Sequence, residues 1–196
     1  MFEVQIKHMI VICFLGLIIV SGFYIFLKSN SEDQQIYNNL LSVLKQSESY
    51  SKMSMKEILS QEVDENVLSA LYMRLSDKCE YGMEFNQCNE VEKNFYLLYD
   101  FNAEVGNGGI EQFIYNSYEN VTVTLAVLKE SSLNYSYSYL SNALNLYPNE
   151  KVEAYENKVL SDALGKLDDQ YYDLHEKEYY DYIIRYVNEH KDSFTD

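Results

Sequence analysis

The side chains that could do chemistry in this sequence are chiefly carboxylates: 31 Asp and Glu residues stand against 15 Lys and Arg, for a formal net charge of -16. The three histidines are His8, His175 and His190, and neither of the later two follows a Glu by three positions, as di-metal sites in helical bundles require. The HExxH and GxSxG patterns are also missing. We therefore predict no enzyme, no cofactor and no metal site, with an envelope hydrolase built on paired carboxylates as an alternative.

Three of the seven glycines gather in EVGNGGIEQFIYNS, residues 104–117. Glycines before a helix can bind an anion, but no strand precedes them, and Glu104 and Glu111 flank the stretch. Gly108 and Gly109 can adopt positive φ without steric cost, and Asn107 also tolerates that region. The stretch therefore predicts the end of one helix and a sharp re-entry into another.

The residues after this break follow helical spacing. Ile110, Phe113 and Ile114 would pack inward, while Gln112 and Asn116 lie four positions apart and so share a face. We expect the two amides to bridge backbone groups of a neighbouring helix or loop.

Cys79 and Cys88 bracket the polar stretch EYGMEFNQ. A disulfide here would close a short loop, would stabilise the fold by about 2–3 kcal/mol, and would need an oxidising compartment. Two free thiols fit the sequence equally well. The spacing matches no zinc site.

Apolar residues recur at helical spacing along most of the chain, and Pro148 is the one proline. The predicted helices cover residues 31–47, 64–78, 89–105, 121–132, 136–147, 149–164 and 168–194, the last of them as one long helix or a bent pair. Alternating Val and Thr at 121–124 would also suit a strand, but the neighbouring pattern favours a helix. We predict an all-α fold: one compact multi-helix domain.

Carboxylates form stripes toward the end of the chain, and we predict that they bind a partner. Asp169, Asp173 and Glu176 follow an i, i+4, i+7 pattern, and Glu153, Glu156 and Asp162 form a looser one. The opposite face, which should be buried, carries Tyr172, Tyr179, Ile183, Tyr186 and Val187. A simple solvated face of an amphipathic helix is the alternative, because Lys and Arg residues interrupt the stripe.

The first 28 residues differ from the rest. Residues 9–27 form an uncharged apolar run between Lys7 and Lys28, long enough as a helix to cross most of a bilayer core of about 30 Å. A cleaved signal peptide is the alternative, but the apolar run continues past its best cleavage site. We predict a single-pass anchor at 1–28, a tether with accessory helices at 29–64 and the helical domain at 65–196. The short N-terminal tail is easier to leave inside the cell, so we expect this domain outside the cytoplasm.

The motif EVGNGGIEQFIYNS resembles the signature of an acidic, all-helical bacterial family typified by a DNA-mimic protein. The similarity continues in LYPNE, in LSDALGKLDDQYYD and in YIIRYVNEHKDSF, and it covers about residues 65–196. Ile110 stands where that family usually has phenylalanine, and the apolar leader is foreign to the typifying protein. The resemblance implies an all-helical fold and a protein partner.

Charge and resemblance together predict a membrane-anchored, non-enzymatic module that binds a basic protein. Its acidic surface repels phosphates, so we expect no direct binding of nucleic acid. An immunity or inhibitor protein that covers the basic active site of a toxin is the alternative function.

Overall fold

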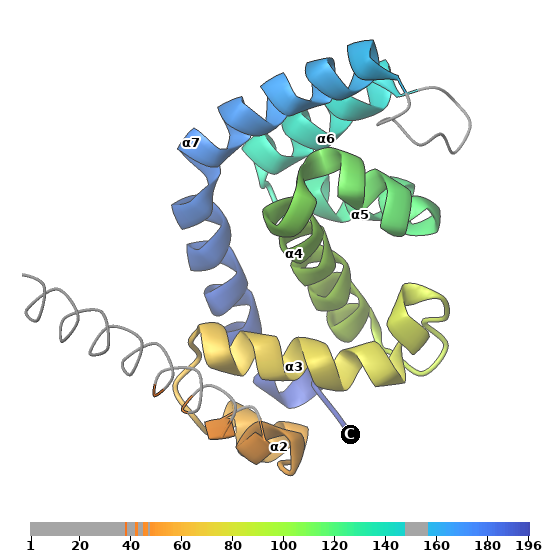
Figure 1. The fold of residues 1–196 in the computed structure, drawn as a ribbon. Helices are drawn as coiled ribbons and strands as arrows, with labels where there is room; N and C mark the ends of the chain where they lie inside the picture. Colours follow the sequence, from red (N-terminus) through yellow and green to blue (C-terminus); the bar gives the residue numbers. More distant parts are fainter. Residues whose placement is uncertain (1–37, 39–41, 43–44, 47, 148–156) are drawn as a thin grey trace, which may run out of the picture. The chain divides into compact units, whose positions relative to one another are not determined.

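The computed structural model describes residues 38, 42, 45–46, 48–147 and 157–196, without side-chain detail for 173–178. The chain divides into two compact units, Met1–Tyr50 and Ser51–Asp196. Figure 1 shows the second unit, which within the described residues is built from helices without strands. The predicted all-α fold is confirmed for this part, while the predicted boundaries at 28 and 64 stay predictions.

The predicted membrane anchor, residues 1–28, lies outside the described residues, as does most of the predicted helix 31–47. Among the helices that the structure does describe, none has the length and apolarity needed to cross a bilayer.

The unit begins with two capped helices, α2 (Met55–Leu59) and α3 (Glu65–Lys78). Ser54 and Glu57 form a reciprocal capping box at α2, and the Asp64 carboxylate accepts the Val67 amide at 2.9 Å to start α3. These caps satisfy backbone N–H groups that a helix start leaves without partners. Helix α3 then packs against both α2 and α4 (Glu90–Asn116).

A disulfide closes the connection after α3. Cys79 and Cys88 are joined, with Cα atoms 6.1 Å apart, so the bonded alternative of the two that the sequence left open is the one in the structure. The enclosed loop includes η1 (Glu80–Gly82). Its Gly82 carbonyl accepts the Asn120 side-chain amide at 3.0 Å, which ties the loop to η2 (Tyr118–Asn120), the turn that follows α4.

Helix α4 is central, because it packs against α3, α5 (Val121–Glu130) and α7 (Lys158–Glu189). Its Phe95, Phe101 and Phe113 are fully buried. The short η2 (Tyr118–Asn120) leads into α5 (Val121–Glu130) and α6 (Asn134–Leu146). The prediction of a helix for the Val/Thr segment is therefore confirmed.

Helix α7 (Lys158–Glu189) joins the last two predicted helices into one, and η4 (Lys191–Ser193) follows it. Figure 1 shows that α7 changes direction, so that its first part runs beside α6 and its second part beside α4. The predicted start of this region, residues 149–156, lies outside the described residues.

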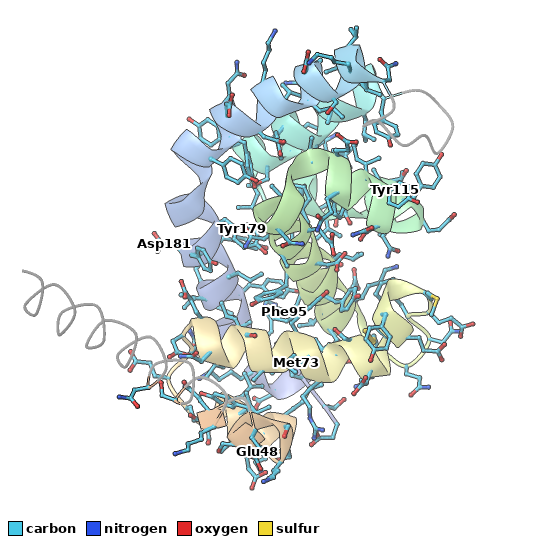
Figure 2. All side chains as sticks on the ribbon, in the orientation of Figure 1. Glu48, Met73, Phe95, Tyr115, Tyr179 and Asp181 are labelled. Carbon is cyan, nitrogen blue, oxygen red and sulfur yellow. A yellow bond between two sulfur atoms is a disulfide. The ribbon has the colours of Figure 1, made fainter. Side chains whose placement is uncertain are left out.

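The bend in α7 corrects the predicted buried face. Tyr179, Ile183 and Val187 are buried as expected, but Tyr172 is 51% exposed and its neighbour Tyr171 is buried instead. The periodicity of one straight helix cannot hold across a bend, because each half must turn its apolar side toward a different neighbour. Figure 2 shows Tyr179 between α7 and α4, with Asp181 on the opposite side of α7.

Candidate functional site

The glycine stretch forms a break inside α4. Gly108 has φ -155° and ψ 20°, and Gly109 has φ 77° and ψ -175°. The second conformation is one that essentially only glycine adopts. The predicted helix end and sharp re-entry are thus confirmed, and Asn107 lies exposed just before the break.

Asp168 of α7 caps the helix that restarts after Gly109. Its Oδ1 accepts the Ile110 backbone N–H at 3.0 Å and also the Tyr139 hydroxyl of α6. A Cβ on Gly109 would lie 2.2 Å from Asp168 Oδ2. Position 109 therefore requires glycine for two reasons: the positive φ of its backbone, and the space that the Asp168 carboxylate occupies. The anion at this helix start is the chain's own side chain rather than a ligand.

A second carboxylate, Glu104, joins the two halves of α4. Its Oε2 accepts the Gln112 amide at 2.8 Å and the Asn116 amide at 2.7 Å. We expected both amides to bridge backbone groups of a neighbouring helix or loop, and that expectation was wrong: the sharp re-entry folds them back onto Glu104. Gly108 leaves the room for this, because a Cβ there would lie 2.1 Å from Gln112 Oε1. Phe113 points inward and meets Phe101 edge to face at 5.0 Å.

A third carboxylate, Asp100, lies one turn before Glu104 and is buried. Its two oxygens accept the Tyr72 hydroxyl at 2.7 Å and the Ser117 hydroxyl at 2.6 Å. Burial raises the pKa of Asp100, and the two hydroxyl donors oppose that shift. Burial and the adjacent Asp100 raise the pKa of Tyr72 far above its usual range. Asp100, Glu104 and Asp168 are therefore committed to holding the break together.

Three tyrosines of α7 fix that helix against α4. The hydroxyls of Tyr172, Tyr179 and Tyr186 donate to the backbone carbonyls of Val105, Leu98 and Val91. The three tyrosines and the three acceptor residues each recur every seven positions. Their order along the chain is opposite, as expected for two helices that pack antiparallel along this length. The spacing YxxxxxxYxxxxxxY was visible in the sequence, and it explains part of the high tyrosine content.

The last residues of the chain are clasped between α3 and α4. Glu92 is fully buried, and its Oε1 receives both Lys78 Nζ and the Thr195 backbone N–H at 2.9 Å. Its Oε2 accepts the Asn89 N–H at 3.0 Å as part of the α4 capping box. A buried ion pair of this kind is costly to break from one side.

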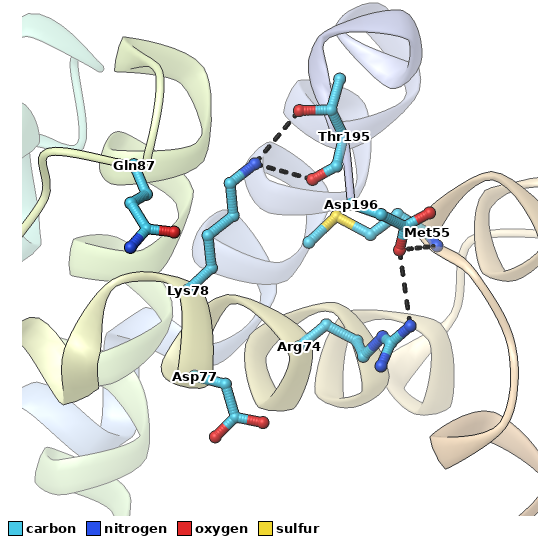
Figure 3. A pocket seen from close by; sticks show the side chains of 7 residues that line it. All are labelled: Met55, Arg74, Asp77, Lys78, Gln87, Thr195 and Asp196. Atoms are coloured by element: carbon cyan, nitrogen blue, oxygen red, sulfur yellow. Dashed lines mark hydrogen bonds and ion pairs between the residues drawn. The ribbon is translucent and has the colours of Figure 1, made fainter.

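A pocket of about 610 Å³ lies beside this clasp. Figure 3 shows Lys78 bonded to Thr195, and Arg74 and the Met55 N–H directed at the Asp196 carboxylate. The lining residues are Met55, Arg74, Asp77, Lys78, Gln87, Thr195 and Asp196. Because the chain's own residues already use both cations, we do not place a partner here.

The structure describes the side chains of only some of the predicted partner-binding carboxylates. Asp162 and Asp169 are exposed on α7, and Asp162 pairs with Lys158 at 2.9 Å. Asp173 and Glu176 lie on α7 without described side chains, and Glu153 and Glu156 lie outside the described residues. Asp181, on the second half of α7, is also exposed.

The carboxylates at the break act as hydrogen-bond acceptors for nearby N–H and O–H groups. Within the described residues, no group of three or more His, Cys, Asp and Glu side chains could hold a metal ion. Sequence reasoning missed the roles of Glu104 and Asp168. Their presence inside the motifs EVGNGGIEQF and KLDDQYYD was the available signal.

Comparison with known sequences gives one family. A sequence model described as "DMP19-like protein" matches residues 86–190, which run from just before α4 to the end of α7 and so include the break, Asp168 and the tyrosine register. Neither the curated proteins nor the solved structures give a match.

Proposed function

The chain belongs to the DMP19-like protein family, a DNA-mimic family, and we propose that it acts by binding a basic protein rather than by catalysis. The family match is the observation that carries this proposal. The net charge of -16 supports it, because opposite charge steers a basic partner toward an acidic surface and rejects nucleic acid.

The outer side of α7 is our candidate for the partner surface. Asp162 and Asp169 are seven residues apart, or about 10.5 Å along a helix axis. Seven residues make close to two full helical turns, so the two carboxylates project from nearly the same side of α7 and can present ordered negative charge to a cationic surface.

We further propose that residues 9–27 anchor the module in a membrane and that the helical domain stands outside the cytoplasm. The length and apolarity of the segment support the anchor. The Cys79–Cys88 bond supports an oxidising compartment. A reporter fused to the chain's end would test the location, and a cytoplasmic signal would contradict it.

The test of the function is capture by the full chain in mild detergent, at low salt and at about 0.5 M salt, from the cells that produce it. We expect basic proteins to be enriched at low salt, lost at high salt and displaced by duplex DNA, because salt shortens the Debye length from about 10 Å at 0.1 M toward 3 Å at 1 M. Enrichment that salt does not change, or none at low salt, would contradict the proposal.

A further inference from the structure

A small cavity lies between α6 and α7, next to the break, since its Tyr139 donates to the Asp168 carboxylate. It has a volume of about 140 Å³ and is lined by Tyr135, Tyr139, Asn142, Leu167, Gln170 and Tyr171. All of these side chains are uncharged, and three of them are tyrosines.

The volume excludes a large ligand. Pockets for drug-sized molecules hold about 300–1,000 Å³, whereas this one has about 140 Å³ and opens to solvent beside the exposed Tyr135. A space of this size suits the end of one side chain.

The aromatic walls are held rigidly. Tyr139 and Tyr171 stack with ring centroids 3.9 Å apart and planes 8° from parallel. Their hydroxyls are already engaged, by Asp168 and Ser136 respectively. Both of these rings are buried and stacked on each other, so the ring face that a cation could reach is that of Tyr135. Tyr135 is 55% exposed and forms the outer wall.

The polar groups around the cavity also suit a cation. The side-chain carbonyls of Asn142 and Gln170 can accept hydrogen bonds from a bound N–H group. Asp168 and Asp169 lie on the same turn of α7 as Leu167 and Gln170, and Asp169 is exposed. They lend the site negative potential without filling it.

We propose that this cavity receives the guanidinium of one arginine from the basic partner. Arginine suits it better than lysine, because its planar group stacks on aromatic rings and offers several donors to carbonyls. This inference rests on the proposed function and adds a specific anchoring point to it.

The test is titration of the full chain with N-acetyl-arginine amide, followed by NMR of the Asn142 and Gln170 side-chain amides. N-acetyl-citrulline amide, which has nearly the same shape without the charge, is the matched probe. We expect saturable shifts with arginine at about millimolar affinity, and citrulline binding at least about five-fold weaker. Equal binding of both probes, or no saturable shift, would overturn the proposal.

Substitutions at Tyr135 test the contribution of its ring face separately from effects on the fold. Tyr135→Ala should weaken arginine binding about three-fold or more, while Tyr135→Phe should keep it because the ring face remains. Tyr81→Ala removes an exposed tyrosine in the disulfide loop and should change nothing. Equal loss of binding in Tyr135→Phe and Tyr135→Ala would contradict a role for the ring face.

The two proposals can fail separately. Salt-sensitive capture of basic proteins without arginine binding would overturn the cavity and leave the function. Arginine binding at the cavity without any such capture would support the cation site and contradict the proposed function.

Discussion

Asp168 and Asp169 are neighbours in the sequence and belong to two different regions of the molecule. Asp168 faces the break of α4, where it and the carboxylates of Asp100 and Glu104 accept hydrogen bonds from their surroundings. Asp169 lies on the outer side of α7 with Asp162 and Asp181, exposed to solvent. The same residue type therefore does two jobs: inner carboxylates hold the fold, and outer carboxylates are available to a partner.

The largest test of the inner region is Gly109→Ala. The substitution places a Cβ against Asp168 and forces alanine into a backbone conformation that it rarely adopts. We expect the free energy of unfolding to fall by about 3–5 kcal/mol, measured by urea denaturation. Gly106→Ala is the matched control, since nothing lies within 4 Å of its Cβ. It should be neutral or slightly stabilising, and an equal loss in both variants would contradict the packing described for the break.

The neighbouring aspartates give the sharpest contrast. Asp168→Ala leaves the Ile110 N–H and the Tyr139 hydroxyl without their acceptor, so we expect a loss of about 2–4 kcal/mol. Asp169→Ala should change stability by no more than about 0.5 kcal/mol. Comparable losses at the two positions would break the distinction between inner and outer carboxylates.

Alkaline pH should lower the free energy of unfolding through the ionisation of buried tyrosines. Burial raises the pKa of Tyr96 to about 12, with Asp100 adding to the shift, and burial likewise raises the pKa of Tyr139. The folded state thus retains protons that the unfolded state loses above about pH 10. This stabilisation is complete below pH 10 and is lost as pH rises through the folded values, by up to about 1.4 kcal/mol per pH unit for Tyr96. Urea denaturation across this range measures it, and a flat stability profile from about pH 9 to 12 would contradict it.

The smallest effects should come from the tyrosine register. Tyr179→Phe removes one buried hydrogen bond to the Leu98 carbonyl and should cost about 1 kcal/mol. Tyr135→Phe, at an exposed position on α6, should cost close to nothing. Thermal unfolding compares the pair, and a register without energetic weight would leave both unchanged.

Local patterns predicted much of this fold and little of its side-chain network. Helical spacing found the segments that became α3 to α7, and the glycines marked the break, because periodicity and positive φ are properties of nearby residues. The inward turn of Asp168 was not predictable, since Asp168 and Asp169 both suit a helix surface and only the packing of α7 against α4 separates them. The packing of the first part of α7 against α6, where Tyr171 stacks on Tyr139, put Tyr171 rather than Tyr172 in the core.

The central claim is tested most directly by a variant that carries Asp162→Asn, Asp169→Asn and Asp181→Asn together, compared with the unaltered full chain for affinity to a captured basic protein. We predict a loss of about ten-fold or more in affinity at low salt with an unchanged melting temperature. Unchanged affinity in a folded variant would contradict the assignment of the outer carboxylates of α7 to partner binding.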